Sequence, residues 1–128
     1  MGHGFKIFLA CDDFVFCQTL RQHFENHPNF EICGEETDPL KAVREAIHAA
    51  PDLVIVELNE VKKDEIDSLD VAETIKTIEP TLPVFLILAH YDLDVERYAV
   101  RQGIDAIFEK GTDLTALSIN AQAVCGVR

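Results

Sequence analysis

The stretch Pro51-Asp52-Leu53-Val54-Ile55-Val56-Glu57-Leu58 decides the fold of this chain. Its apolar residues, Leu53 to Val56, form a continuous run instead of alternating with polar ones, which predicts a strand covered on both faces. A second run, Val84 to Leu88, has the same character. Buried strands of this kind occur in parallel sheets with helices on both sides. We therefore expect an α/β fold.

Strand-like and helix-like segments alternate along the rest of the chain. The expected strands are Phe5 to Cys11, Phe30 to Gly34, Leu53 to Val56, Val84 to Leu88 and Ala106 to Phe108. Apolar residues recur at helical spacing between and after them, in stretches that begin at Phe14, Leu40, Leu69, Val95 and Leu114. This order predicts a (βα)5 fold with right-handed crossovers.

Two boundaries carry recognisable helix-end chemistry. Asp38 followed by Pro39 suits a helix N-terminus, and Gly103 suits a left-handed residue after a helix. With 128 residues, of which 48% are apolar, the chain is long enough for one core and too short for two. We expect a single domain over residues 1–128.

The charge balance limits the partners of the chain. Eleven Lys and Arg residues stand against 23 Asp and Glu residues, for a formal net charge of -12. This excess disfavours direct binding to nucleic acids or anionic membranes, and it favours cations or basic protein surfaces.

Two further features predict a cytoplasmic protein. No apolar stretch reaches the roughly 18 to 20 residues that span a bilayer, and residues 1–4 lack the features of a signal peptide. The four cysteines are widely spaced, without a C-x-x-C pair, and we expect reduced thiols that are buried or half-buried: Cys11, Cys17, Cys33 and Cys125.

Charged side chains stand where the predicted strands end. Asp12 and Asp13 follow the first strand, Glu57 the third and Lys110 the fifth. In open α/β sheets ligands gather at the carboxyl ends of strands, so we expect these groups to converge. Three close carboxylates repel one another unless a cation offsets their charge, and Mg²⁺ with oxygen ligands is the expected candidate.

Four segments together resemble the receiver domain of two-component response regulators. They are Lys6 to Asp13, Pro51 to Leu58, Pro83 to His90 and Gly103 to Lys110. The likeness extends from about Phe5 to Val124, and it implies a flavodoxin-like sheet with the strand order 2-1-3-4-5. It is strongest to receivers of DNA-binding regulators with a helix-turn-helix output, although no such output domain is present here.

The resemblance implies a role for some residues of the site. Asp12 and Asp13 match the acidic pair that holds Mg²⁺, and Lys110 matches the lysine that contacts the phosphoryl group. Asn59 stands where the family offers a backbone carbonyl to the metal.

Other positions depart from the family. Glu57 replaces the aspartate that accepts the phosphoryl group. Leu88, which precedes Ala89, replaces the Ser or Thr whose hydroxyl contacts the phosphoryl group. Ile107 replaces the aromatic switch residue. The loop that begins at Asn59 is also longer than usual. We therefore expect little or no phosphorylation.

Glu57 admits two readings from the sequence. Its longer side chain could reach Lys110 and imitate part of the phosphorylated state, or it could stay hydrated at the rim of a site that has lost its activity. His90 follows the fourth strand and is expected to be solvated.

The sequence is compatible with three functions. The first is a receiver-like signalling module that contacts an output protein and a histidine kinase, and that forms a homodimer through about Asp94 to Val124. The second is a receiver that accepts phosphate slowly, or at another carboxylate such as Asp12. The third is a Mg²⁺-dependent phosphohydrolase, which is disfavoured because no Gly-rich phosphate loop is found and no Ser or Thr is expected beside the carboxylates.

Overall fold

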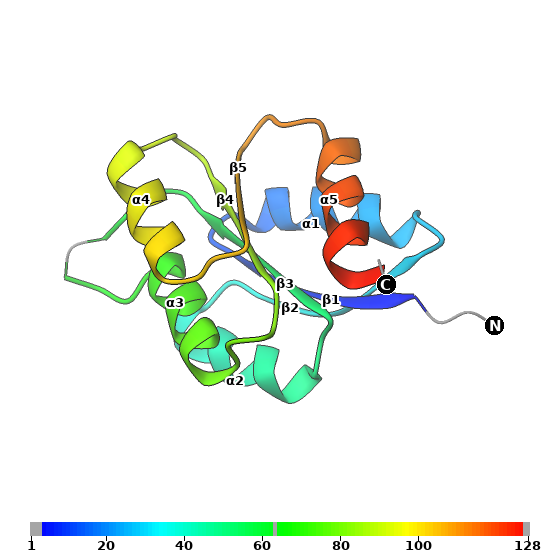
Figure 1. The fold of residues 1–128 in the computed structure, drawn as a ribbon, viewed down its shortest axis with the longest axis horizontal. Coiled ribbons are helices and arrows are strands. Elements are labelled where there is room, and N and C mark those ends of the chain that lie inside the picture. Colours follow the sequence, from blue (N-terminus) through cyan, green and yellow to red (C-terminus); the bar gives the residue numbers. More distant parts are fainter. Residues whose placement is uncertain (1–3, 63, 127–128) are drawn as a thin grey trace.

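The computed structural model describes residues 4–62 and 64–126. The first three residues, on which the expectation about a signal peptide partly rests, lie outside this range. Five strands and five helices alternate along the chain (Figure 1). They are β1 (Phe5–Cys11), α1 (Phe14–Glu25), β2 (Phe30–Glu36), α2 (Pro39–Ala49), β3 (Leu53–Leu58), α3 (Ser68–Ile78), β4 (Val84–Leu88), α4 (Leu93–Arg101), β5 (Ala106–Glu109) and α5 (Leu114–Gly126).

The strands form one parallel sheet in the order β2-β1-β3-β4-β5, which confirms the predicted α/β fold and its strand order. Three strands run further than expected, because β2 ends at Glu36, β3 at Leu58 and β5 at Glu109. Glu57 is thus a residue of β3 itself. It is paired in register with Cys11 on one side and Ile87 on the other.

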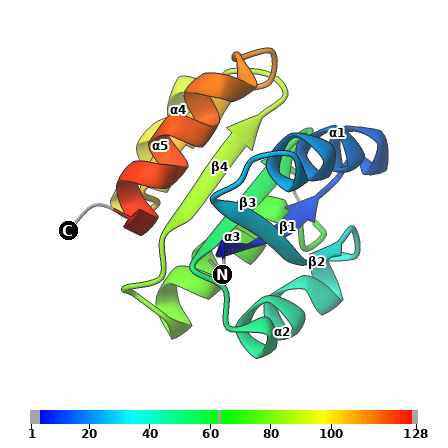
Figure 2. The ribbon, with the colours of Figure 1, turned by 90° about the vertical axis from the view of Figure 1, so that its right-hand side faces the viewer.

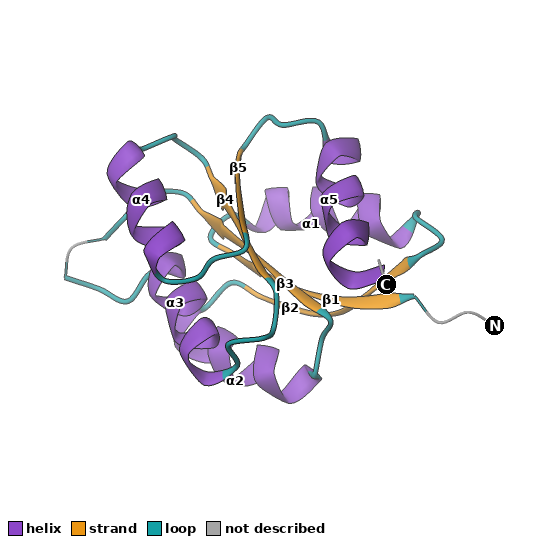
Figure 3. Cartoon of the chain, viewed as in Figure 1, coloured by secondary structure: helices purple, strands orange, loops and turns teal. Residues whose placement is uncertain are grey.

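Helices cover both faces of the sheet, as Figures 2 and 3 show. One core lies under α1 and α5 and contains Leu9, Phe24 and Phe85, while the other lies under α2, α3 and α4 and contains Val54, Ile75 and Leu86. Alternate residues of the central strands therefore enter different cores. This arrangement explains why Leu53 to Val56 is apolar without a break.

Aspartate side chains accept backbone hydrogen bonds at the start of every helix. Asp13, Asp38, Asp67 and Asp92 cap α1 to α4, and Asp113 accepts from the backbone N–H of Thr115 at the start of α5. The expected boundary at Asp38 and Pro39 is confirmed, and Gly103 has the expected positive φ, 87°.

These helix starts follow the carboxyl ends of the strands. Much of the negative charge of the chain therefore lies at one edge of the sheet.

Among the described residues, no helix combines the length and the apolar character that a membrane span requires.

Candidate functional site

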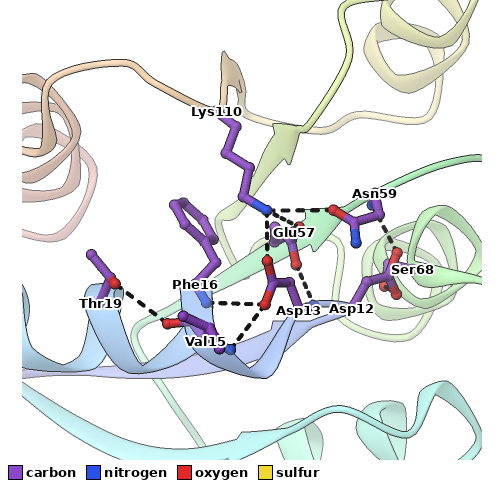
Figure 4. Close-up of polar contacts among 9 residues, drawn as sticks. All are labelled: Asp12, Asp13, Val15, Phe16, Thr19, Glu57, Asn59, Ser68 and Lys110. Atoms are coloured by element: carbon purple, nitrogen blue, oxygen red, sulfur yellow. Dashed lines mark hydrogen bonds and ion pairs between the residues drawn. The ribbon is translucent and has the colours of Figure 1, made fainter.

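The carboxyl edge of the sheet brings together the charged residues that the sequence singles out. Asp12 and Asp13 lie between β1 and α1, Glu57 lies near the end of β3, and Lys110 follows β5 (Figure 4). Because β3 lies beside β1 in the sheet, Glu57 and the two aspartates are neighbours although more than 40 positions separate them. The expected convergence is found.

Glu57 is buried completely, with a relative exposure of 0%. Its Oε1 accepts a hydrogen bond from the backbone N–H of Asp13 at 2.9 Å, and its Oε2 accepts from the ammonium of Lys110 at 3.1 Å. Of the two readings from the sequence, the reach toward Lys110 is the observed geometry. The hydrated position at the rim is wrong, because the extra methylene extends the carboxylate into contact with these donors.

Lys110 places its ammonium among three oxygen atoms. It lies 3.1 Å from Glu57 Oε2, 3.1 Å from Asp13 Oδ2 and 3.4 Å from Asn59 Oδ1, and it lies 4.6 Å from the ring centre of Phe16. Burial opposes the charge, but hydrogen bonds to Glu57 and Asp13 outweigh it, so the pKa of Lys110 lies above its ordinary value. Lys110 is therefore a fixed positive charge at the centre of the site.

The two carboxylate oxygens of Asp13 accept hydrogen bonds from different groups, one from the start of α1 and the other from Lys110. Its Oδ1 accepts from the backbone N–H groups of Val15 and Phe16 at the start of α1, and its Oδ2 accepts from Lys110. The hydrogen bond from Lys110, followed by the one from Phe16, holds the pKa of Asp13 below its ordinary value. Asp13 is thus ionised at neutral pH.

Asp12 is bound by a residue that the sequence analysis missed. The hydroxyl of Ser68 donates to Asp12 Oδ1 at 2.6 Å, and the backbone N–H of Asn59 donates to Asp12 Oδ2 at 2.8 Å. The expectation that no Ser or Thr lies beside the carboxylates is wrong. Ser68 is the first residue of α3, directly after the capping Asp67, so the start of that helix was the available signal.

The carboxylates of the site are all engaged by donors of the protein itself. Each of the six carboxylate oxygens of Asp12, Asp13 and Glu57 already accepts a hydrogen bond from a protein donor. Mg²⁺ binds oxygen ligands in octahedral geometry at about 2.0 to 2.1 Å, commonly one or two carboxylates together with several waters. Within residues 4–62 and 64–126, no three His, Cys, Asp or Glu side chains are grouped so that they could hold a metal ion. In this structure Lys110 is the cation that offsets the carboxylates, and the expected Mg²⁺ remains a prediction.

Leu88, Ala89 and Ile107, which were matched to the phosphoryl-contacting and switch positions, have apolar surroundings. Leu88 is buried at the end of β4, and the backbone N–H of Ala89 donates to the carbonyl of Leu58. Ile107 is half-buried and packs against the core under α2, α3 and α4. No hydroxyl from Leu88 or Ala89 faces the carboxylates, and His90 is exposed, as expected.

Comparison with known proteins gives a fold. No family model matches the chain. A DNA-binding response regulator of the LuxR family from Staphylococcus aureus aligns with a TM-score of 0.83 and 20% identity, over 95% of this chain and 99% of that one. The signal receiver domain of the putative response regulator NarL from Mycobacterium tuberculosis aligns with a TM-score of 0.81 and 19% identity, over 98% and 99%.

The same similarity reaches a more distant protein. A CheY-like response regulator receiver domain protein from Methanospirillum hungatei JF-1 aligns with a TM-score of 0.81 and 13% identity, over 94% of this chain and 93% of that one. The chain has the fold of a response regulator receiver domain. At these identities the similarity establishes the fold and leaves the activity to the residues of the site.

Proposed function

We propose that this protein is an atypical receiver that signals through protein contacts and is not phosphorylated at Glu57. The observation that carries the proposal is the complete burial of Glu57, with its two oxygens bound to the backbone N–H of Asp13 and to Lys110. A buried carboxylate whose oxygens are both engaged is not available to attack an incoming phosphoryl group.

The geometry also opposes the transfer itself. Phosphoryl transfer requires in-line placement of the acceptor oxygen, and a misplacement of about 1 Å can cost on the order of 10²-fold in rate. The extra methylene of Glu57 moves the carboxylate by about this distance. Leu88 offers no hydroxyl to a phosphoryl oxygen, so that stabilisation is lost as well.

The ion pair between Glu57 and Lys110 supplies an alternative to phosphorylation. In the family the lysine at this position contacts the phosphoryl group, and here Lys110 is already held by Glu57 and Asp13. We propose that this contact keeps Lys110 where a phosphoryl group would hold it. The protein would then adopt one signalling state without Mg²⁺ and without a phosphodonor.

The test is intact-mass measurement after incubation with Mg²⁺ and a small phosphodonor such as acetyl phosphate. We expect no gain of a phosphoryl group. The double variant Glu57→Asp, Leu88→Thr is the matched control, because it restores the acceptor and the hydroxyl, and it should gain one phosphoryl group. A phosphorylated parent protein would overturn the proposal.

The same measurement separates the other two functions. A phosphoryl group that appears on the parent and disappears in Asp12→Asn would indicate a receiver that uses Asp12. Continuous consumption of the donor without an adduct would indicate a phosphohydrolase. Ser68 beside Asp12 makes the second outcome chemically conceivable, but both oxygens of Asp12 are engaged by donors, which disfavours it.

The contacts expected of such a protein follow from its fold. We propose a cytoplasmic location, an output protein or a histidine kinase as the partner, and a homodimer through α4, β5 and α5. The exposed side chains of Ile119 and Val124 on α5 support the dimer, since α5 has no charged residue that would repel a second copy. Light scattering at several concentrations tests it, and a strict monomer would contradict it.

A further inference from the structure

A groove lies between the loop that follows β3 and the first turns of α4. Two cavities of about 450 Å³ and 270 Å³ adjoin there, and both are lined by Val61, Asp92 and Val95. In Figure 1 this loop projects beside α4, away from α1 and α5. We call the two cavities together the loop–α4 groove.

The floor of the loop–α4 groove is apolar. Leu69, Val95 and Tyr98 line the larger cavity, and Leu58 and Leu88 line the smaller one. Large apolar side chains are also exposed around the groove, and Val61 at its centre is 48% exposed. Tyr91, which lines the smaller cavity, is exposed, and so are Ile66 and Leu93, which are next in sequence to lining residues. Exposed apolar side chains gathered in one place are typical of a binding surface.

The rim of the groove is strongly acidic. Six carboxylates line the two cavities among the described residues, against one lysine and one histidine. They are Glu60, Glu65, Asp67, Asp70, Asp92 and Asp94, with Lys62 and His90. Such a rim repels nucleic acid and anionic membranes, and it attracts the cationic side chains of a protein partner.

These carboxylates divide into two groups. Asp67, Asp70 and Asp92 accept backbone hydrogen bonds at helix starts, and Asp67 also accepts from the backbone N–H of Lys62 at 2.8 Å. Glu60, Glu65 and Asp94 are exposed, the two glutamates on the loop and Asp94 on α4. The first group is engaged within the protein, and the second carries exposed charge that cationic side chains of a partner can bind.

We propose that the loop–α4 groove binds a basic amphipathic segment of a partner protein. Apolar side chains of the segment would contact Val61 and Val95, and its Lys or Arg side chains would pair with Glu65 and Asp94. The proposal rests on the proposed function, in which this protein signals by contact, and it identifies the surface and the chemistry of the partner.

The groove is connected to the buried acidic site through both ends of its loop. Asn59 at the start of the loop donates its backbone N–H to Asp12 and offers its side-chain oxygen to Lys110. Ser68 just beyond the end of the loop donates to Asp12. A segment that moves the loop therefore acts on the contacts of Asp12 and Lys110, and the state of Glu57 and Lys110 acts on the shape of the groove.

The experiment uses a synthetic helical peptide with Leu on one face and Lys on the other, and a matched peptide with Glu in place of Lys. Titration into the ¹⁵N-labelled protein is followed by amide chemical shifts. We expect the Lys peptide to shift residues around Val61, Leu69 and Val95, and the Glu peptide to leave them unchanged. Shifts spread over the whole acidic surface, or absent from the groove, would overturn the proposal.

Charge-reversal variants separate a specific site from general attraction. Asp94→Lys should weaken binding of the Lys peptide about tenfold. Glu31→Lys makes the same change in net charge on the exposed surface of β2, at the far edge of the sheet, and should weaken it much less. Equal weakening by both variants would contradict the proposal.

A third variant tests the apolar floor. Val61→Ser should also weaken binding, and Val15→Ser, at an exposed valine of α1, should not. An effect of Val15→Ser as large as that of Val61→Ser would contradict a specific groove. Failure of peptide binding would leave the mass measurement of phosphorylation unaffected, so failures of the two proposals are distinguishable.

Discussion

Two lysines at opposite edges of the sheet show how differently an ammonium group can be held. Lys76 in α3 is 8% exposed and donates to the carbonyls of Pro80 and Leu82 at 2.9 Å each and to Asp105 Oδ2 at 3.0 Å. Lys110 has a side-chain exposure of 24% and lies among the side-chain oxygens of Asp13, Glu57 and Asn59.

The difference lies in charge balance. Lys76 has one carboxylate and two neutral carbonyls, so its positive charge is matched and its contacts join α3 to the starts of β4 and β5. Lys110 faces two carboxylates, with Asp12 close by, so the site retains excess negative charge. The contacts of Lys76 join segments of the fold, whereas those of Lys110 offset negative charge within the site.

Replacing Lys76 should give the largest loss of stability. Lys76→Met leaves two carbonyls without their donor and Asp105 without its counter-charge, and we expect it to lower the free energy of unfolding by about 3 kcal/mol. Urea unfolding measures the change. Lys41→Met, at an exposed lysine of α2, is the control and should change stability by less than about 0.5 kcal/mol. Similar losses of stability in both variants would contradict a structural role for Lys76.

Replacing Lys110 should have a smaller effect that a second substitution reverses. Lys110→Met leaves the buried carboxylate of Glu57 without a counter-charge and should cost about 2 kcal/mol. Adding Glu57→Gln removes that charge and keeps an acceptor for the backbone N–H of Asp13. The double variant should regain more than half of the loss in urea unfolding. A double variant as unstable as the sum of the two single ones would show that the ion pair is not coupled.

Asp105→Asn tests the balanced pair from the other side. The amide oxygen still accepts from the backbone N–H of Val84, and Lys76 keeps its two carbonyls, so we expect a loss of about 1 kcal/mol. Asp52→Asn is the matched control, because Asp52 also accepts a backbone hydrogen bond, from Lys6, without an ion pair to a lysine. Both variants are measured by urea unfolding. Equal losses would show that the charge of Asp105 adds nothing to its hydrogen bond.

The smallest expected effect is in the acid range. The pKa of Asp13 lies below its ordinary value because of the hydrogen bonds from Lys110 and Phe16. Its stabilising contribution is therefore complete above the ordinary pKa of about 4 and is lost as the pH falls through the lower, folded-state pKa. Asp13→Asn should lose less stability than the parent between pH 5 and pH 3, as measured by urea unfolding. A steeper decline in the variant would contradict this assignment.

Much of the fold was predictable because its signals are local. The continuous apolar runs of Leu53 to Val56 and Val84 to Leu88 indicated buried parallel strands, and Asp38 with Pro39 marked a helix start. The order of polar residues at strand ends was equally local, and it correctly indicated that Asp12, Asp13, Glu57 and Lys110 would meet. Strand ends were missed by one or two residues, because pairing with a neighbouring strand extends β2 and β3 past their apolar runs.

Contacts between distant segments could not be predicted in the same way. The sequence around Ser68 does not show that its hydroxyl donates to Asp12, 56 positions away. This contact depends on how the loop after β3 places the start of α3. The loop–α4 groove likewise depends on packing, since the loop after β3 and the start of α4 line it together.

The sequence by itself determined the architecture and the charged residues at the carboxyl edge of the sheet. The reason is that the spacing of apolar residues and the residues at strand ends are properties of short segments. Tertiary structure alone decided which atoms meet. It buries Glu57, places Lys110 between the carboxylates of Asp13 and Glu57, and binds Lys76 to two carbonyls and Asp105 at the opposite edge. Burial and hydrogen-bond geometry depend on segments far apart in the chain, and only their packing fixes them.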